Sequence, residues 1–301
     1  FQCDPSLSVA ALCESISPRV IAELIEPLCV SALNTPADRA SAQVFLRVMH
    51  DSLFSPRGGS NLLLPRVDLS ALLPDAAARW LELKGVRIHM GTRATLSQPA
   101  PTGTAGRWQV NDQVFDTAML ATSASNATLA LPYCASTATK TVADLINSWI
   151  TTTAALRFEA IATVYAWRPD ARLKQPMLAL RSRASAPAQF VFDRGQLGGP
   201  AGLLAFVVSA SADERDILQA RVLAQARDQL GLDLQPVQTV VEKRATFACT
   251  PALVRPPLQT APGLLACGDY VAGPYPATLE GAVRSGRAAA AAAGASIRGM
   301  P

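Results

Sequence analysis

Residues 264–293 read LLACGDYVAGPYPATLEGAVRSGRAAAAAA, and this stretch decides the fold. Its pattern predicts a short buried strand over 264–267, a glycine-rich loop, and an alanine-rich helix over 279–293. Asp269 directly follows the strand. In an open α/β sheet this position faces the crevice where such folds bind ligands, and a carboxylate there can accept hydrogen bonds from sugar hydroxyls.

The first turn of the predicted helix is the second feature of the stretch. Thr278 to Ala282 offer backbone N–H groups and the positive end of the helix dipole, which suit a carbonyl or a charge-rich ring edge. Gly281 allows the backbone to approach a flat ring, while Gly286 and the alanines at 288–293 allow tight packing on a sheet. From the residues alone, a terminal helix packed by small residues, with Asp269 as a loop cap, explains the pattern equally well.

Helices dominate the first part of the chain. Apolar residues recur at helical spacing over 7–12, 20–28 and 44–53, with Ser17-Pro18 as a helix start and Asn34-Thr35-Pro36 as a break. After a loop at 57–60, the pattern predicts a helix over 69–83 with apolar residues on one side, a strand over 86–90, a hairpin over 108–115 and a strand over 117–121.

The second part reads as an antiparallel sheet with helices. The predicted strands cover 160–167, 177–180, 189–192, 203–209 and 237–247, and one strong helix covers 212–230. A proline-rich linker at 251–263 then leads back to the strand at 264–267.

Composition excludes several classes of function. The 301 residues carry a net charge of +4, with Lys and Arg scattered along the chain, which argues against a nucleic-acid surface. No apolar run is long enough to cross a bilayer. The six cysteines form no C-x-x-C pair and have no histidine at ligand spacing, so we expect buried free thiols and no metal site. Two histidines supply hydrolase chemistry poorly.

The stretch GDYVAGPYPATLEGAVRSGRAAA (268–290) resembles the carboxy-terminal flavin-binding motif of the amine-oxidase/phytoene-desaturase superfamily. The segment from Pro56 to Leu96, with FDTAMLATS (115–123) after it, resembles the middle part of the same flavin domain. The resemblance implies FAD as the cofactor. It places cofactor contacts on Gly268, Asp269, Pro276, Ala277, Thr278, Leu279, Glu280, Gly281 and Ala282, and further contacts on Ala94 and Thr122.

The resemblance also implies the fold class: α/β with α+β character, in which a partial Rossmann-like FAD domain is interleaved with a substrate domain of antiparallel sheet and helices. The expected boundaries are 1–55 for the helical part of the substrate domain, 56–128 for the middle FAD segment, 129–256 for the sheet part of the substrate domain, and 257–301 for the final FAD segment.

Three further blocks, within 26–54, 57–70 and 242–251, resemble the squalene-associated FAD enzymes of bacterial hopanoid synthesis. That branch implies reduction of hydroxysqualene, an isoprenoid lipid substrate, to squalene. It also implies a cytoplasmic protein, and peripheral contact with the inner membrane surface stays open as an alternative. The reaction needs an acid, for which Glu26, Asp51 and Glu280 are only weak candidates. Lys243 and Arg244 are two further weak candidates for catalytic residues. Cys29, Asn34 and Thr35 are weak candidates for lining the substrate cavity.

One departure from the family pattern limits these expectations. The family begins with a strand, a Gly-x-Gly-x-x-Gly turn and a helix that hold the FAD pyrophosphate. This chain contains no such unit, since Gly195, Gly198, Gly199 and Gly202 lie between predicted strands. We therefore expect a truncated chain that is inactive alone and that needs a missing amino-terminal segment. Two alternatives stay open: a flavin amine oxidase or carotenoid desaturase, and a flavin-free fragment without catalytic function.

Overall fold

The structure, a computed structural model, describes residues 1–54, 57–98 and 107–298, apart from the side chains of 296–298. Contacts divide the chain into two compact units: residues 1–90 with 158–251, and residues 91–157 with 252–301. Compared with the predicted boundaries, residues 56–90 group with the first unit and residues 129–157 with the second. The roles assigned to the predicted domains stay predictions.

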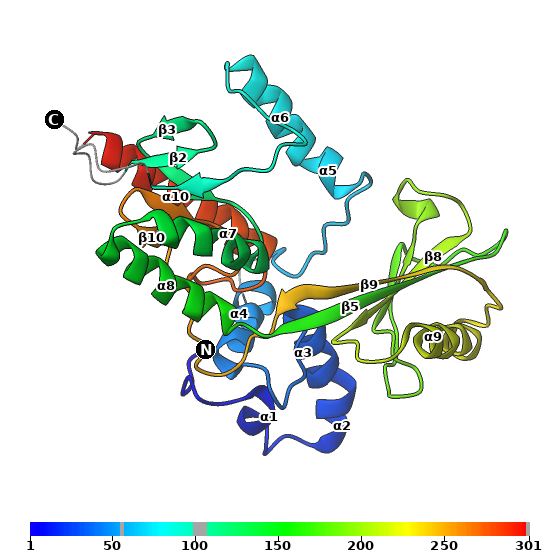
Figure 1. Cartoon of the computed structure of the whole chain (residues 1–301). Helices are drawn as coiled ribbons and strands as arrows, with labels where there is room; N and C mark the ends of the chain where they lie inside the picture. The colour runs from blue at the N-terminus through cyan, green and yellow to red at the C-terminus, as the bar shows by residue number, and fades with distance from the viewer. Residues whose placement is uncertain (55–56, 99–106, 299–301) are drawn as a thin grey trace. The chain divides into compact units, whose positions relative to one another are not determined.

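A five-stranded antiparallel sheet lies at the centre of the first unit, and its strands β5 and β9 are long (Figure 1). The strand order is β6-β7-β8-β5-β9, so β6, β7 and β8 are successive neighbours, while the connections from β5 to β6 and from β8 to β9 join strands that are not adjacent. The strands are β5 (Phe158–Trp167), β6 (Met177–Ala179), β7 (Phe190–Asp193), β8 (Leu203–Ser209) and β9 (Gln235–Phe247). All five were predicted from their apolar patterns to within three residues, and they are confirmed.

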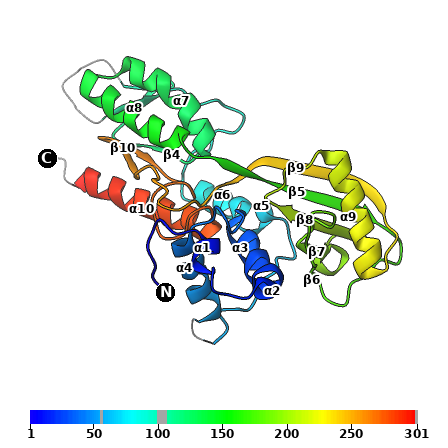
Figure 2. The ribbon, with the colours of Figure 1, turned by 90° about the horizontal axis from the view of Figure 1, so that it is seen from below.

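Helix α9 (Arg215–Leu230) covers one face of this sheet (Figure 2). Alternate residues of β5 and β8 point to that face and form one buried cluster with Leu218, Val222 and Ala226 of the helix. Gln225 lies beside them, almost fully buried, and its amide bonds both backbone groups of Ala188 at 2.9 Å. The predicted helix over 212–230 is therefore confirmed, with a start three residues later.

Short helices make up the rest of the first unit. They are α1 (Val9–Leu12), α2 (Pro18–Val20), the π-helical turn Ile21–Ile25, α3 (Glu26–Leu33), α4 (Ala42–Leu53), α5 (Leu69–Leu72) and α6 (Pro74–Leu83), with the 3-10 turn Gly195–Leu197 following β7. The predicted cap at Ser17 is present, and α3 ends where Asn34 takes a left-handed conformation with φ of 49°.

Two predictions for residues 69–90 are wrong. The single helix is broken at Leu73, because the residue before a proline avoids helical angles and Pro74 begins a new helix. Its apolar side, which includes Trp80 and Leu83, is exposed. Residues 86–90 form no strand, because alternation alone supplies no neighbouring strand to pair with.

The second unit contains two small sheets. In one, β4 (Ala118–Leu120) pairs in parallel with β11 (Leu264–Ala266), which pairs antiparallel with β10 (Gln259–Ala261). The other is the antiparallel set β1 (Leu96–Ser97), β2 (Trp108–Val110) and β3 (Gln113–Phe115), which confirms the predicted hairpin. Helix α10 (Leu279–Arg298) packs Ala289 and Ala293 against Leu265 of β11.

Helices α7 (Ala124–Thr137) and α8 (Lys140–Ala154) lie side by side in the second unit, and the sequence patterns had not indicated them (Figures 1 and 2). The buried residues Ile146, Trp149 and Thr153 of α8 follow helical spacing. Trp149 donates from Nε1 to the carbonyl of Pro257 at 2.9 Å, so α8 holds the proline-rich segment that leads to β10.

Candidate functional site

The two parallel strands of the second unit end at the same edge of their sheet. Cys267 donates its N–H to the carbonyl of Leu120 at 2.9 Å, which extends the pairing of β4 and β11 by one residue. Ala121-Thr122 and Gly268-Asp269 directly follow these strands. The structure therefore brings Thr122 and Asp269 to one sheet edge, where α/β folds bind ligands, as the sequence predicted.

Gly268 occupies a position that a larger residue cannot take. Its φ is 159°, and a Cβ atom there would lie 2.6 Å from Cε1 of the Tyr270 ring. The ring itself is buried edge-to-face against Trp149, with centroids 6.1 Å apart. Glycine is thus needed at position 268 because the Tyr270 ring packs directly against the backbone there.

Asp269 is half-buried at the end of β11. Burial raises the pKa of its carboxyl, against the opposing effects of hydrogen bonds from the N–H groups of Asp269 and Tyr270 and of the Arg255 charge. A carboxylate can accept about four hydrogen bonds, so these two N–H groups leave acceptor capacity for a ligand hydroxyl. The free acceptor positions of this carboxylate fit the hydroxyl groups in the sugar-like part of a nucleotide cofactor.

A closed turn joins Asp269 to the helix α10. Ala277 adopts a left-handed conformation (φ 55°) and donates its N–H to the carbonyl of Asp269 at 3.3 Å. The hydroxyl of Thr278 accepts from the N–H of Gly281 at 3.0 Å and donates to the carbonyl of Tyr275 at 2.9 Å, which caps the helix. Pro276 to Ala282 are thereby held in one continuous turn, and Leu279 and Glu280 at its tip are exposed.

The structure explains the two glycines of helix α10 differently from the sequence prediction. A Cβ atom on Gly281 would lie 2.0 Å from the carbonyl oxygen of Tyr275, so its own turn requires the glycine. A close approach to a flat ring stays a prediction. Around Gly286 the space is open, so this glycine is not needed for packing. Ala289 and Ala293 make the contact with the sheet instead.

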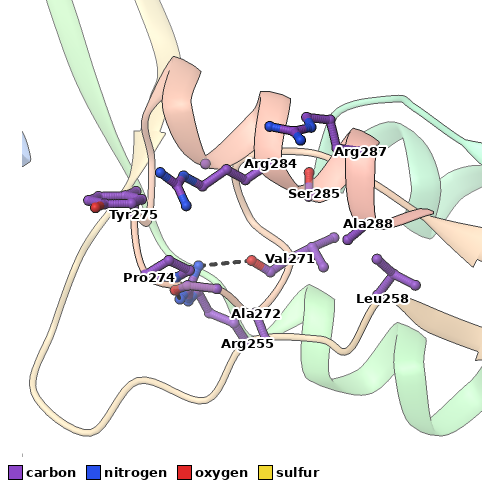
Figure 3. A pocket seen from close by; sticks show the side chains of 12 residues that line it. Arg255, Leu258, Val271, Ala272, Pro274, Tyr275, Arg284, Ser285, Arg287 and Ala288 are labelled. Atoms are coloured by element: carbon purple, nitrogen blue, oxygen red, sulfur yellow. Dashed lines mark hydrogen bonds between the residues drawn. The ribbon is translucent and has the colours of Figure 1, made fainter. Parts of the chain in front are cut away.

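A pocket of about 490 Å³ lies beside this turn (Figure 3). Three guanidinium groups line it, and sequence reasoning had missed all of them. Arg255 donates to the carbonyls of Val271 (2.9 Å) and Gly273, while Arg284 pairs with Glu280 at 2.5 Å and lies over the Tyr275 ring at 4.9 Å. Arg287 is exposed on the same helix. These charges make the pocket attractive to an anionic group.

Ser285 is a further residue that sequence reasoning missed. It lies on α10, is buried, and its hydroxyl accepts from the N–H of Gly268 at 2.9 Å and lies 3.0 Å from the carbonyl of the same glycine. Little in the sequence indicated this contact, because Ser285 lies 17 residues from Gly268 and resembles any small residue of an alanine-rich helix.

The remaining predicted residues are not part of this turn and lie in several different elements. Ala94 is exposed in an irregular stretch just before β1. The weak catalytic candidates other than Glu280 lie in the first unit. Asp51 pairs with Arg47 at 2.6 Å and His50 at 2.7 Å, and Lys243 and Arg244 are exposed on β9.

Glu26 begins helix α3 and accepts long hydrogen bonds, of 3.3 and 3.4 Å, from the N–H of Ala37. It also lines a second pocket of about 380 Å³, in the first unit, together with Arg183 and the ion pair of Asp213 and Arg221. The mixed charges of this pocket suit a polar ligand better than a hydrocarbon chain.

Cys29, Asn34 and Thr35 are buried and bonded within the first unit. Asn34 accepts from the N–H of Ala210 at 2.6 Å and donates to Thr246 at 2.9 Å, while Thr35 accepts from the N–H of Cys249 at 3.2 Å. Burial raises the pKa of the Cys29 thiol to about 12. Neither of the two pockets described above is lined by these three side chains.

Two general features complete the description. Among the described residues, no cluster of three or more His, Cys, Asp or Glu side chains is arranged to hold a metal ion. Within the same ranges, no helix has both the length and the apolar character that crossing a membrane requires.

Comparison with known families identifies one match over most of the chain. The family described as flavin containing amine oxidoreductase matches residues 14–293. Hydroxysqualene dehydroxylase of Sinorhizobium fredii is 27% identical over 279 residues, which are 89% of this chain and 61% of that protein. Hydroxysqualene dehydroxylase of Rhodopseudomonas palustris is 47% identical over 64 residues, which are 20% of this chain and 15% of that protein.

Solved structures show the same fold. An oxidoreductase from Methanosarcina mazei superposes with a TM-score of 0.68 at 13% identity, over 94% of this chain and 68% of that one. The mixed α/β architecture, which contains a five-stranded antiparallel sheet and a small sheet with one parallel pair, is therefore the architecture predicted from the sequence.

Proposed function

The chain belongs to the flavin containing amine oxidoreductase family, and from this premise we propose that it forms the larger part of an FAD-dependent oxidoreductase that reduces hydroxysqualene to squalene. The chain spans 61% of the length of the curated relative from Sinorhizobium fredii. The activity, the isoprenoid lipid substrate and a location at the cytoplasmic membrane surface are therefore proposed for the whole protein.

The observation that carries the proposal is the turn at the carboxyl ends of β4 and β11. Its chemistry fits FAD: the Asp269 carboxylate can accept from ribityl hydroxyls, and the first turn of α10 presents N–H groups and a positive dipole end. The arginine-lined pocket beside it favours an anionic group. When bound, FAD would supply the hydride chemistry that no side chain of this chain can provide.

The residues of this chain would bind and orient. Asp269 would hold the cofactor by hydrogen bonds, and the Thr278-capped helix start would stabilise charge at the ring edge. Glu280 is ion-paired with Arg284, and Asp51 with Arg47 and His50. Of the weak acid candidates, Glu26 therefore has the weakest hydrogen bonds, and it borders a pocket. We propose no acid among them.

A substrate comparison tests the reaction. The whole protein, of which this chain is proposed to form the larger part, is loaded with FAD, reduced under anaerobic conditions and incubated with hydroxysqualene, and squalene is measured by gas chromatography. We expect reoxidation of the flavin with formation of squalene. The control uses oxidised enzyme with primary and secondary amines, because the family name covers amine oxidoreductases. Bleaching of the flavin by an amine, with no squalene formed, would contradict the proposed substrate while preserving the oxidoreductase class.

A further inference from the structure

The carboxyl end of β11 leaves the backbone of Gly268 without a strand partner. The parallel pairing with β4 ends where Cys267 donates to Leu120, so the next N–H and carbonyl need other partners. A backbone polar group that is shielded from water and left unpaired destabilises the fold. A side chain that bonds these groups therefore helps to fix where the chain leaves the sheet.

Ser285 supplies the partner of the N–H and is one of two partners of the carbonyl, which also accepts from the N–H of Val271 at 3.3 Å. Its Oγ accepts from the N–H of Gly268 at 2.9 Å, and it lies within donor distance of two carbonyls, that of Gly268 at 3.0 Å and that of Ala282 at 2.8 Å. The contact with Ala282 is the ordinary bond of a helical serine to the preceding turn. The two contacts with Gly268 join α10 to the end of β11 across 17 residues of chain.

The surroundings make this contact rigid. One helical turn further on, Ala289 is buried against β11, which holds this face of α10 on the sheet. On the other side the Tyr270 ring fills the space where a Cβ of Gly268 would lie. Gly268 is thus fixed by the serine hydroxyl on one side and an aromatic ring on the other, and Asp269 is the next residue.

We infer that Ser285 is a positioning residue that fixes the Gly268-Asp269 turn and thereby aims the Asp269 carboxylate at the cofactor. The second half of this inference rests on the proposed function, whereas the first half concerns the chain alone.

The test uses Ser285→Ala, with Ser136→Ala as the matched control. Ser136 also lies on a helix of the second unit and donates to the carbonyl three residues back at 2.8 Å, but it is exposed. Hydrogen exchange is measured on the chain without FAD, and FAD affinity is measured by flavin fluorescence. For Ser285→Ala we expect amide exchange of Gly268 and Asp269 to be about tenfold faster and the Kd for FAD about tenfold higher, because one buried hydrogen bond is lost.

The outcomes separate the two halves of the inference. Unchanged exchange in Ser285→Ala, or an equal effect in Ser136→Ala, would overturn it. Faster exchange with an unchanged Kd for FAD would overturn the positioning role. Faster exchange in a chain whose unsubstituted form binds no FAD would refute the proposed function and leave the fixed turn standing. If Ser285→Ala does not fold, Ser285→Cys keeps the bulk with weaker hydrogen bonds and should give a smaller shift in the same direction.

Discussion

Gly281 has no side chain because its own turn leaves no room for one. A Cβ atom there would lie 2.0 Å from the carbonyl oxygen of Tyr275, while Gly286 in the next turn of the helix faces open space. We expect Gly281→Ala to lower the free energy of unfolding by about 2–3 kcal/mol through strain in the turn. Gly286→Ala should raise it by roughly 0.5–1 kcal/mol, because alanine favours a helix. Urea unfolding of both variants checks this pair, and equal stabilities would contradict the account of Gly281.

The ionisation of Asp269 should affect folding in a defined direction. Burial, the largest effect, raises the pKa of its carboxyl above the ordinary value of 3.8. The folded chain therefore binds this proton more tightly than the unfolded chain does, and the associated stability is lost as the pH rises through the folded-state pKa.

We compare the unsubstituted chain with Asp269→Asn, which cannot ionise. The difference between their free energies of unfolding should favour the unsubstituted chain most below pH 3.8 and should decline as the pH rises above that value. Urea unfolding at a series of pH values measures it. A difference that grows with pH would show that hydrogen bonds to the carboxylate outweigh its burial.

At the scale of single residues, the sequence predicted those parts of the site that are contiguous in the chain. Asp269 and Thr278 lie between a strand and a helix, so the local pattern predicted their places in the chain, and the resemblance implied their role. Ser285 and Arg255 reach the same turn from a helix and from the proline-rich segment, and only the folded backbone brings them there. Arg255 also resembles a surface cation, although its guanidinium binds backbone carbonyls.

Among the secondary-structure elements, α9 packs on the five-stranded sheet through apolar residues and through the buried polar side chain of Gln225. Gln225 bonds the N–H and carbonyl of Ala188, each at 2.9 Å. We expect Gln225→Leu to lower the free energy of unfolding by about 2–4 kcal/mol, because both backbone groups of Ala188 then lose a buried partner.

Gln229 provides the matched control for this prediction. It bonds both backbone groups of Arg181 in the same way, at 3.0 and 2.8 Å, but from an exposed position where water can replace it. Gln229→Leu should cost less than about 1 kcal/mol. Thermal and urea unfolding measure both variants, and losses of similar size would mean that burial is not the deciding factor.

The elements that sequence patterns predicted well are those with a strong period of their own. The strands of the large sheet alternate or are continuously apolar, and the buried residues of α9 recur at helical spacing. Helix α7 was missed because its apolar residues surround it and Pro132 lies within it, and α8 was missed although its buried residues follow a helical period. Residues 86–90 alternate but find no strand partner, so local pattern and tertiary structure disagree there.

Considered as a whole, the molecule is built from two units that each use two stretches of sequence. The candidate cofactor residues come from both stretches of the second unit: Thr122 from 91–157, and Asp269 with the helix start from 252–301. A cofactor bound at that sheet edge would join the two stretches. Saturation with FAD at 100 times its Kd should stabilise the folded chain by about 2.7 kcal/mol. Thermal unfolding with and without FAD measures this, and riboflavin is the control for the nucleotide part.

The most direct test of the account is FAD binding by the purified chain and its Asp269→Ala variant. Flavin fluorescence and visible absorbance are followed during titration. We predict saturable binding with one FAD per chain, and a Kd about tenfold or more higher in Asp269→Ala, because the carboxylate accepts hydrogen bonds from the cofactor. The account would be contradicted by a chain that leaves the flavin spectrum unchanged, or by equal affinities of the two proteins.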